Sequence, residues 1–177
     1  MSRSGAARRI KEHALELGFC AVGIADSGRP LGADAFEEWL AEGRHADMGW
    51  IAERAAERLD PSLLIPEARS VIVVASDYGH GPDSPLPTGA GRVARYARGR
   101  DYHNVIGRRL MKLRRFLLQE MPGARVYKSV DAGAVLERSW AAASGLAAFG
   151  KATNVLDGER GSWLLLGVLV VDRPLPP

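Results

Sequence analysis

Cysteine is the residue that this sequence lacks most clearly. Among its 177 residues only Cys20 carries a thiol. One thiol excludes an intrachain disulfide, and it also excludes a thiolate cluster that could hold structural zinc or an iron–sulfur centre. Cys20 falls in a short apolar run without an electropositive neighbour in the sequence, so we expect it to pack in the core rather than to react.

Long apolar runs are also missing. No segment approaches the ~20 consecutive apolar residues of a membrane-spanning helix, and the N-terminus has no apolar core before a small-residue cleavage site. We therefore expect a cytoplasmic protein without a membrane partner. A length of 177 residues suits one domain, and we expect residues 1–177 to form it.

Acidic residues are scarce in one basic stretch. Between Arg92 and Arg115 there are nine Lys or Arg residues and one acid, Asp101, although the net charge of the whole chain is only +3. Up to residue 102 this stretch interleaves arginines with aromatics: Arg92, Arg95, Tyr96, Arg98, Arg100 and Tyr102. Such a pattern combines phosphate-binding charge with faces on which unpaired bases can stack, and it is a weak signal for single-stranded RNA. Within the helix that follows, we expect the charges to form a solvated face.

The hydrophobic pattern predicts alternating helices and strands. Apolar spacing indicates helices near residues 3–17, 33–42 and 101–121, and apolar runs indicate strands near residues 19–25, 70–76, 125–130 and 164–171. This order is typical of an α/β domain whose sheet is covered by helices on both faces. Residues 79–92 contain four Gly and three Pro and should form an irregular loop. His80 in this loop has no ligand-spaced partner, so we expect no metal site there.

Asp131 is the leading candidate for chemistry. It follows the third predicted strand and precedes Ala132-Gly133, after which Val135, Leu136, Trp140 and Ala143 fall on one helical stripe. In open α/β sheets ligands collect outside the carboxyl ends of strands, so an acid there is a site candidate. Asp is equally a preferred helix N-cap. On spacing alone both interpretations stay open.

Nine segments, in order along the chain, resemble the N-terminal region of epoxyqueuosine reductases, the cobalamin-dependent iron–sulfur enzymes of tRNA queuosine biosynthesis. They are GFCAVGIA, FEEWLAEGRHADMGWIAER, Arg58-x-Asp60-Pro61, PEARSVIVVASDY, RYARGRDYH, VDAGAVLERSWAAASGL, GKATN, GSWLLLG and DRPLPP. The resemblance implies a mixed sheet, like that of the corrinoid-binding domains of reductive dehalogenases and of nitroreductase-like folds.

The resemblance also implies roles for particular residues. Asp131 would be the catalytic acid. The corrinoid-binding residues would be Arg58, Asp131, Lys151, Thr153, Asn154, Val155, Ser162 and Trp163. The residues that bind the tRNA anticodon loop would be Arg95, Tyr96, Arg98, Tyr102 and Arg138. No residue of this chain would bind a metal.

The chain departs from the family pattern at several positions. Ala132 stands where the family usually has Thr or Ser, and Ala134 stands where it usually has Pro. Before the GK element the family usually has Gly and then an aromatic residue, where this chain has Ala147-Ala148-Phe149. Val168 stands where the family usually has Glu. The family continues with cysteines for two [4Fe–4S] clusters in a ferredoxin-like domain, and none of these is present here. Together with the Pro-rich end, the missing cysteines indicate that the chain is either a fragment of the enzyme or a stand-alone relative. In either case we expect the chain to be inactive by itself.

The resemblance therefore predicts an oxidoreductase component that reduces epoxyqueuosine to queuosine in tRNA, with an external electron donor that the sequence does not identify. Two alternatives stay open. One is a corrinoid- or flavin-binding module that lacks this activity. The other is a small RNA-binding module in which Asp131 merely caps a helix.

Overall fold

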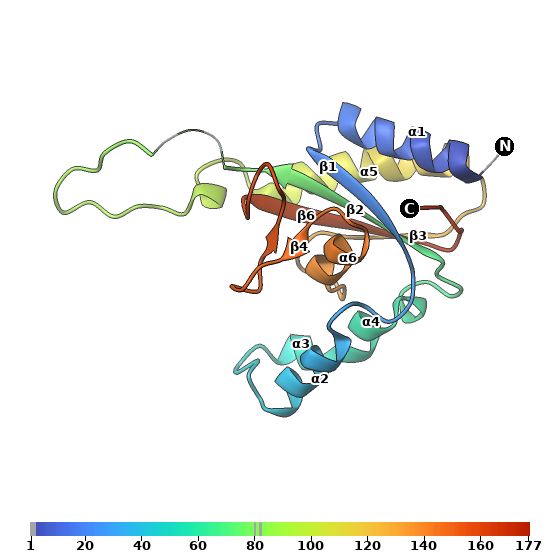
Figure 1. Ribbon diagram of the computed structural model, residues 1–177, viewed down its shortest axis with the longest axis horizontal. Coiled ribbons are helices and arrows are strands. Elements are labelled where there is room, and N and C mark those ends of the chain that lie inside the picture. The colour runs from blue at the N-terminus through green and yellow to red at the C-terminus, as the bar shows by residue number, and fades with distance from the viewer. Residues whose placement is uncertain (1–2, 80, 82) are drawn as a thin grey trace.

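Residues 3–79, 81 and 83–177 are described by a computed structural model of the chain (Figure 1). His80, where we expect no metal site, lies outside these residues. The helices are α1 (Arg3–Glu16), α2 (Ala33–Ala41), α3 (Gly49–Glu53), α4 (Ala55–Leu59), α5 (Tyr102–Glu120) and α6 (Glu137–Ala143), with 3-10 turns η1 (Pro61–Leu63) and η2 (Arg95–Ala97). The strands are β1 (Ala21–Asp26), β2 (Ser70–Asp77), β3 (Val126–Ser129), β4 (Ala148–Phe149), β5 (Val155–Leu156) and β6 (Leu164–Val171).

The main sheet has the strand order β1-β2-β6-β3, and each of these neighbouring pairs is antiparallel. The α/β class is confirmed, but the sheet formed by the described strands is antiparallel rather than mixed. The reason lies in the long connection between the first two strands. Asp26 at the end of β1 pairs with Ser70 at the start of β2. The connection that contains α2, α3 and α4 therefore leaves the sheet and returns to it at the same end (Figure 1). A parallel pair would need a crossover to the opposite end.

Helices cover both faces of this sheet, as expected. Alternate residues of each strand point to opposite faces, so Ile72 and Val74 of β2 pack with α1 and α5, whereas Val71 and Val73 pack with α6. Gly167 of β6 allows α5 to approach closely, since a Cβ there would lie 2.7 Å from Leu110 Cδ1. This contact fixes α5 against the centre of the sheet.

The helix predicted after Gly133 begins later in the structure than the apolar stripe from Val135 indicates. Residues 130–136 are irregular, and α6 begins only at Glu137. Because the sheet is antiparallel, the rule that ligands collect at the carboxyl ends of parallel strands no longer supports a site at Asp131. The case for Asp131 must therefore come from its own surroundings.

Of the helices in the described part of the chain, none is long and apolar enough to cross a membrane.

Candidate active site

Asp131 lies at the apex of a very tight turn. The backbone N–H of Ala132 donates to the carbonyl of Val130 across a distance of 2.6 Å, and Asp131 between them has a φ of 58°. This left-handed conformation is strained for a residue with a Cβ, although Asp tolerates it better than most. The turn projects the carboxylate into solvent, with 64% of the side chain exposed.

Asp131 does not cap α6. The N-cap position of that helix is Leu136, which makes no side-chain capping bond. The capping interpretation is therefore wrong, because the irregular stretch between Asp131 and Glu137 separates the carboxylate from the first helical N–H groups.

The partners of Asp131 come instead from the start of α5. The hydroxyl of Tyr102 donates a hydrogen bond to Asp131 Oδ2, and His103 Nε2 lies 3.4 Å from the same oxygen. The other ring nitrogen of His103, Nδ1, is 2.9 Å from Oδ1 of Asp101, the N-cap residue of α5. Burial raises the pKa of Tyr102, and the hydrogen bond and negative charge of Asp131 raise it further. Tyr102 therefore stays a proton donor to this carboxylate.

A second carboxyl group lies beneath the turn. The carboxyl of Glu137 is enclosed by protein, although the residue as a whole is only partly buried, and it accepts a hydrogen bond of 3.1 Å from Ser129 Oγ. Burial raises the pKa of Glu137 to about 7, with a smaller contribution from the charge of Asp131. The sequence reasoning missed Glu137. Glu137 could have been noticed in the sequence because it directly follows the apolar residues Ala134, Val135 and Leu136.

Arg58 ties the turn to the distant α4. Its Nη1 donates a 3.0 Å hydrogen bond to the carbonyl of Gly133, while its Nε is buried without a partner in the described part of the structure. Gly133 lies tightly over Ser129, since a Cβ on Gly133 would be 2.1 Å from Ser129 Oγ. Val168, where the family has Glu, is fully buried and pairs with Ser129 in the sheet register. On the sheet side, Glu137 thus contacts the hydroxyl of Ser129, whose partner in the sheet register is the apolar Val168.

A row of aromatic rings leads to Asp131 from the loop before β6. Ring centroids are 5.5 Å apart for Trp163 and Tyr78, 6.5 Å for Tyr78 and Tyr96, and 6.1 Å for Tyr96 and Tyr102. Arg95 covers the start of the row, with its Cζ 4.6 Å from the Trp163 ring centroid. The row joins a residue expected to bind the cofactor, Trp163, to residues expected to bind RNA.

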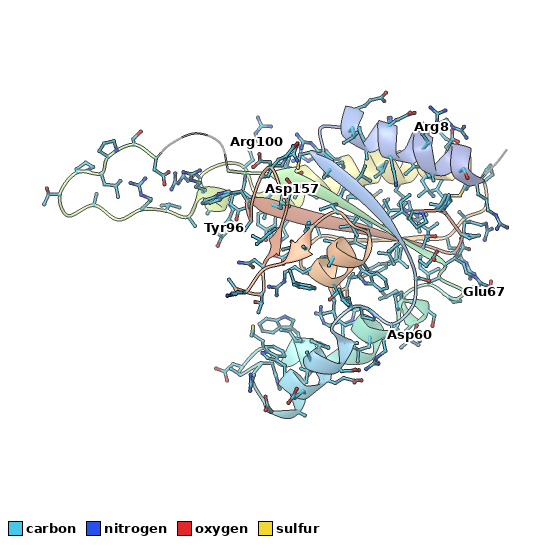
Figure 2. The ribbon with its side chains drawn as sticks, in the orientation of Figure 1. Arg8, Asp60, Glu67, Tyr96, Arg100 and Asp157 are labelled. Atoms are coloured by element: carbon cyan, nitrogen blue, oxygen red, sulfur yellow. The ribbon has the colours of Figure 1, made fainter. Side chains whose placement is uncertain are left out.

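The arginine loop, residues 92–100, is folded onto one carboxylate. Asp83 lies 2.6 Å from Arg98, 3.3 Å from Arg92 and 3.4 Å from Arg95. Tyr96 and Arg100 lie at the base of the projecting loop (Figure 2), and Tyr96 is 49% exposed. The arginines expected to bind RNA phosphates are therefore gathered together, with an internal anion among them.

The remaining residues expected to bind the corrinoid lie on two neighbouring surface segments. Lys151, Thr153 and Asn154 are exposed in the turn between β4 and β5, and Ser162 and Trp163 are exposed just before β6. The side chain of Val155 is buried in the core, so this residue offers only its backbone.

Arg138, expected to bind RNA, contacts this same surface rather than the arginine loop. Its Nη1 donates a 3.0 Å hydrogen bond to the carbonyl of Thr153. The exposed amine, hydroxyl, amide and indole groups, together with the unpaired Nε of Arg58, suit the amide-rich edge of a corrinoid. The residues present therefore fit that group.

The relatives that are most similar in sequence are epoxyqueuosine reductases. Residues 58–132 match the family described as "Epoxyqueuosine reductase QueG, DUF1730". The epoxyqueuosine reductase of Synechococcus sp. (strain CC9605) is 41% identical over 170 residues, which cover 94% of this chain and 52% of that protein. The chain thus spans about half the length of the curated relatives it matches.

Solved structures share the fold. A crystal structure of epoxyqueuosine reductase with an epoxyqueuosine-modified tRNA-Tyr stem loop superimposes with a TM-score of 0.85 at 23% identity, over 99% of this chain and 48% of that chain. A reductive dehalogenase whose structure suggests a mechanism for B12-dependent dehalogenation gives a TM-score of 0.57 at 20% identity, over 100% of this chain and 21% of that chain. At these identities the likeness concerns the fold alone. The segment that matches the family model runs from Arg58 to just past Asp131, and in sequence the chain is similar to the N-terminal region of epoxyqueuosine reductases.

Proposed function

We propose that this chain is the cobalamin- and substrate-binding part of an enzyme that reduces epoxyqueuosine to queuosine in the anticodon loop of tRNA. The observation that carries the proposal is the exposed carboxylate of Asp131, held at the apex of a strained turn by Tyr102 within the segment that matches the family. The relative solved with an epoxyqueuosine-modified stem loop supports the RNA substrate. The B12-dependent dehalogenase with the same fold supports the corrinoid.

The proposed chemistry needs a proton donor at one place. Turning an epoxide into an alkene breaks both carbon–oxygen bonds, and the oxygen leaves as water after two electrons and two protons have been taken up. Cobalamin, when bound, supplies the reducing equivalents through its cobalt. Asp131 delivers a proton to the departing oxygen as general acid.

The geometry of Asp131 suits that role. Both of its contacts within the described residues, from Tyr102 and from His103, are made to Oδ2. Oδ2 is therefore the anchored oxygen, and Oδ1 remains available to hold the transferable proton. Glu137, whose pKa burial raises to about 7, lies near enough to interact with the charge of Asp131 and can hold a proton at neutral pH.

Cofactor and RNA would contact different parts of this surface. Lys151, Thr153, Asn154, Ser162 and Trp163 would hold the corrinoid, with the backbone of Val155 and the guanidinium of Arg58. The arginine loop would bind phosphates through Arg95 and Arg98, and Tyr96 would stack on a base. Because one cysteine cannot hold a cluster, electrons must come from outside this chain, and we expect no turnover by the 177 residues alone.

The deciding experiment is Asp131→Asn in a complete enzyme that contains this chain. The variant keeps the size and polarity of the side chain but loses the transferable proton, so it should bind cobalamin and tRNA normally and fail to reduce epoxyqueuosine. Near-normal turnover would remove Asp131 from the mechanism. Loss of cobalamin binding would assign Asp131 to cofactor binding, and the proton source would then be sought at Tyr102 or His103.

A titration of the purified chain tests the cofactor separately. Cob(II)alamin should change its absorption spectrum on binding, and flavin mononucleotide should not. A response to flavin alone would favour the flavin-binding alternative, and silence with retained RNA affinity would favour the RNA-binding module.

A further inference from the structure

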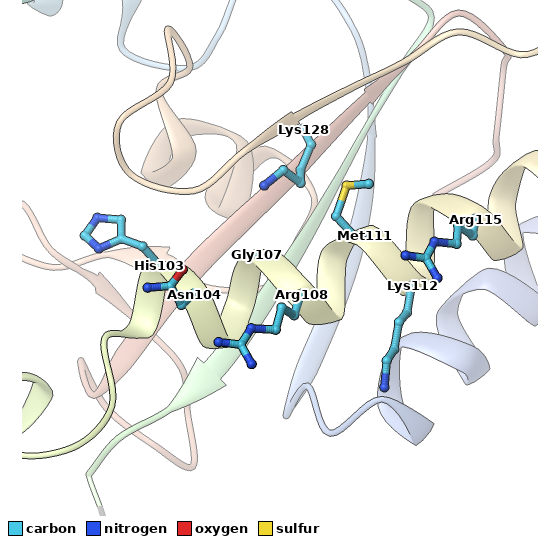
Figure 3. Close-up of a pocket in the computed structure, with 8 residues that line it drawn as sticks. All are labelled: His103, Asn104, Gly107, Arg108, Met111, Lys112, Arg115 and Lys128. Carbon is cyan, nitrogen blue, oxygen red and sulfur yellow. The ribbon is translucent and has the colours of Figure 1, made fainter.

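A basic groove runs along α5, away from Asp131. It has a volume of about 450 Å³ and is lined by His103, Asn104, Gly107, Arg108, Met111, Lys112, Arg115 and Lys128. We call it the α5 groove. Figure 3 shows these side chains spread along the helix, with Lys128 reaching toward it from the neighbouring strand β3. Lys128 lies over Gly107, since a Cβ on that glycine would be 3.5 Å from its Nζ.

The groove contains cations and no carboxylate. Among its eight lining residues are two arginines, two lysines and one histidine, and none is Asp or Glu. A neighbouring hollow continues this surface through Asn104 and Arg108 to Arg100. Its only acid, Asp101, is the N-cap of α5 and is already bonded to His103 and Asn104.

The arginines and lysines of the groove, unlike His103, also lack a carboxylate partner in the part of the chain that the structure describes. Some arginines elsewhere in the chain are paired with acids, as Arg98 is with Asp83 and Arg9 with Glu120. Within residues 3–79, 81 and 83–177, by contrast, Arg108, Lys112, Arg115 and Lys128 form no ion pair. Their mutual repulsion in one groove is relieved when an anion binds, and a row of charges suits an extended anion better than a single phosphate.

The groove is continuous with the proposed active site. His103 lines its near end and also approaches Asp131 Oδ2. From His103 to Arg115 the helix rises about 18 Å, at 1.5 Å per residue. We propose that the α5 groove binds the phosphodiester backbone of the RNA strand that leads away from the nucleotide held at Asp131. This inference rests on the proposed function and adds to it a second RNA-binding surface, separate from the arginine loop.

The test compares two double variants of the purified chain with a fluorescein-labelled RNA anticodon stem-loop. The first is Arg108→Ala with Lys112→Ala, in the groove. The matched control is Arg29→Ala with Arg44→Ala, which removes two positive charges beside α2, at the far side of the molecule from α5 (Figure 1). All four sites are partly or fully exposed, and alanine favours helix, so thermal melts should show that both variants fold.

The groove variant should bind the stem-loop at least ~10-fold more weakly at low salt. The slope of log Kd against log salt should become shallower by about two, one for each lost phosphate contact, while the control keeps the slope of the unmodified chain. An unchanged slope in the groove variant would overturn the inference and leave the groove to an acidic protein partner. If Arg95→Ala with Arg98→Ala still weakened RNA binding in that case, the proposed function would stand. No RNA binding by the unmodified chain would overturn both.

Discussion

The hydroxyl of Tyr102 donates a hydrogen bond to the carboxylate of Asp131, 29 positions further along the chain. This bond joins the first turn of α5 to the tight turn after β3. It explains how an exposed carboxylate on a strained backbone is held in one place, since neither residue could do this alone. It also makes the titration of Tyr102 a reporter of the charge on Asp131.

The first prediction concerns that titration. Asp131→Asn should lower the pKa of Tyr102, because the variant removes the negative charge that opposes phenolate formation, although burial still keeps this pKa above its ordinary value. Absorbance near 295 nm, read as a difference from Tyr102→Phe, measures it. Asp101→Asn is the control and should lower the pKa less, since Asp101 contributes least to the shift. Equal values in the unmodified chain and Asp131→Asn would contradict the assigned contact.

Much of the fold could be predicted from local sequence. The expected strand at residues 164–171 is β6 to the residue, and the helix expected from residue 3 is α1, because apolar runs and helical spacing report which face is buried. The start of α6 could not be predicted this way. The stripe from Val135 onward suits a helix, but Arg58, 75 positions away, holds the carbonyl of Gly133 in an irregular turn. Local spacing carries no information about such a partner.

The candidate site could be predicted only in part, because local sequence does not show which residues meet in the folded chain. Asp131 and Tyr102 could be named from the sequence, but their contact depends on how α5 packs on the sheet. Glu137 was missed because its importance comes from burial under the turn. Asp83 was missed because a lone acid in a Gly- and Pro-rich loop gives no sign that three arginines will gather around it.

The second prediction uses Glu137 and stability. Its pKa in the folded chain, about 7, lies above the ordinary value of 4.5, so the folded state binds this proton more tightly than the unfolded state. Its stabilising contribution is therefore fully present below about pH 4.5 and is lost as the pH rises through about 7. Glu137→Gln should lose this dependence and become the more stable form at alkaline pH, by roughly 1–3 kcal/mol.

Urea unfolding at a series of pH values measures this difference. The difference between the variant and the unmodified chain cancels the contribution to pH-dependent stability of carboxyls whose pKa the fold lowers, such as those of Asp172 and Asp101. Exposed Glu38→Gln serves as the control and should follow the unmodified chain. Parallel curves for Glu137→Gln and the unmodified chain would show that the carboxyl of Glu137 is hydrated in solution.

The third prediction concerns the arginine loop. Asp83→Asn removes the charge that holds Arg92, Arg95 and Arg98, so an RNA stem-loop no longer competes with an internal anion. RNA binding should tighten several-fold, with a steeper salt dependence. The matched control is Asp34→Asn, because Asp34 lies on α2 and is an ion-pair partner of Arg29. This variant should change neither the RNA affinity nor its salt dependence. Weaker RNA binding by Asp83→Asn would mean that Asp83 orders the arginines for RNA rather than competing with it.

The last prediction concerns the packing that supports the turn. In Gly133→Ala the added methyl group would meet Ser129 Oγ at 2.1 Å and Tyr127 Oη at 3.2 Å, so the turn must move and Ser129 must release Glu137. We expect a loss of about 1–3 kcal/mol in the free energy of unfolding, measured by urea denaturation. Gly99→Ala is the matched control, because a Cβ there meets nothing within 4 Å. It should be neutral or slightly stabilising. If the two variants unfolded alike, the turn would not rest on Ser129, and the enclosure of Glu137 beneath Asp131 would need another cause.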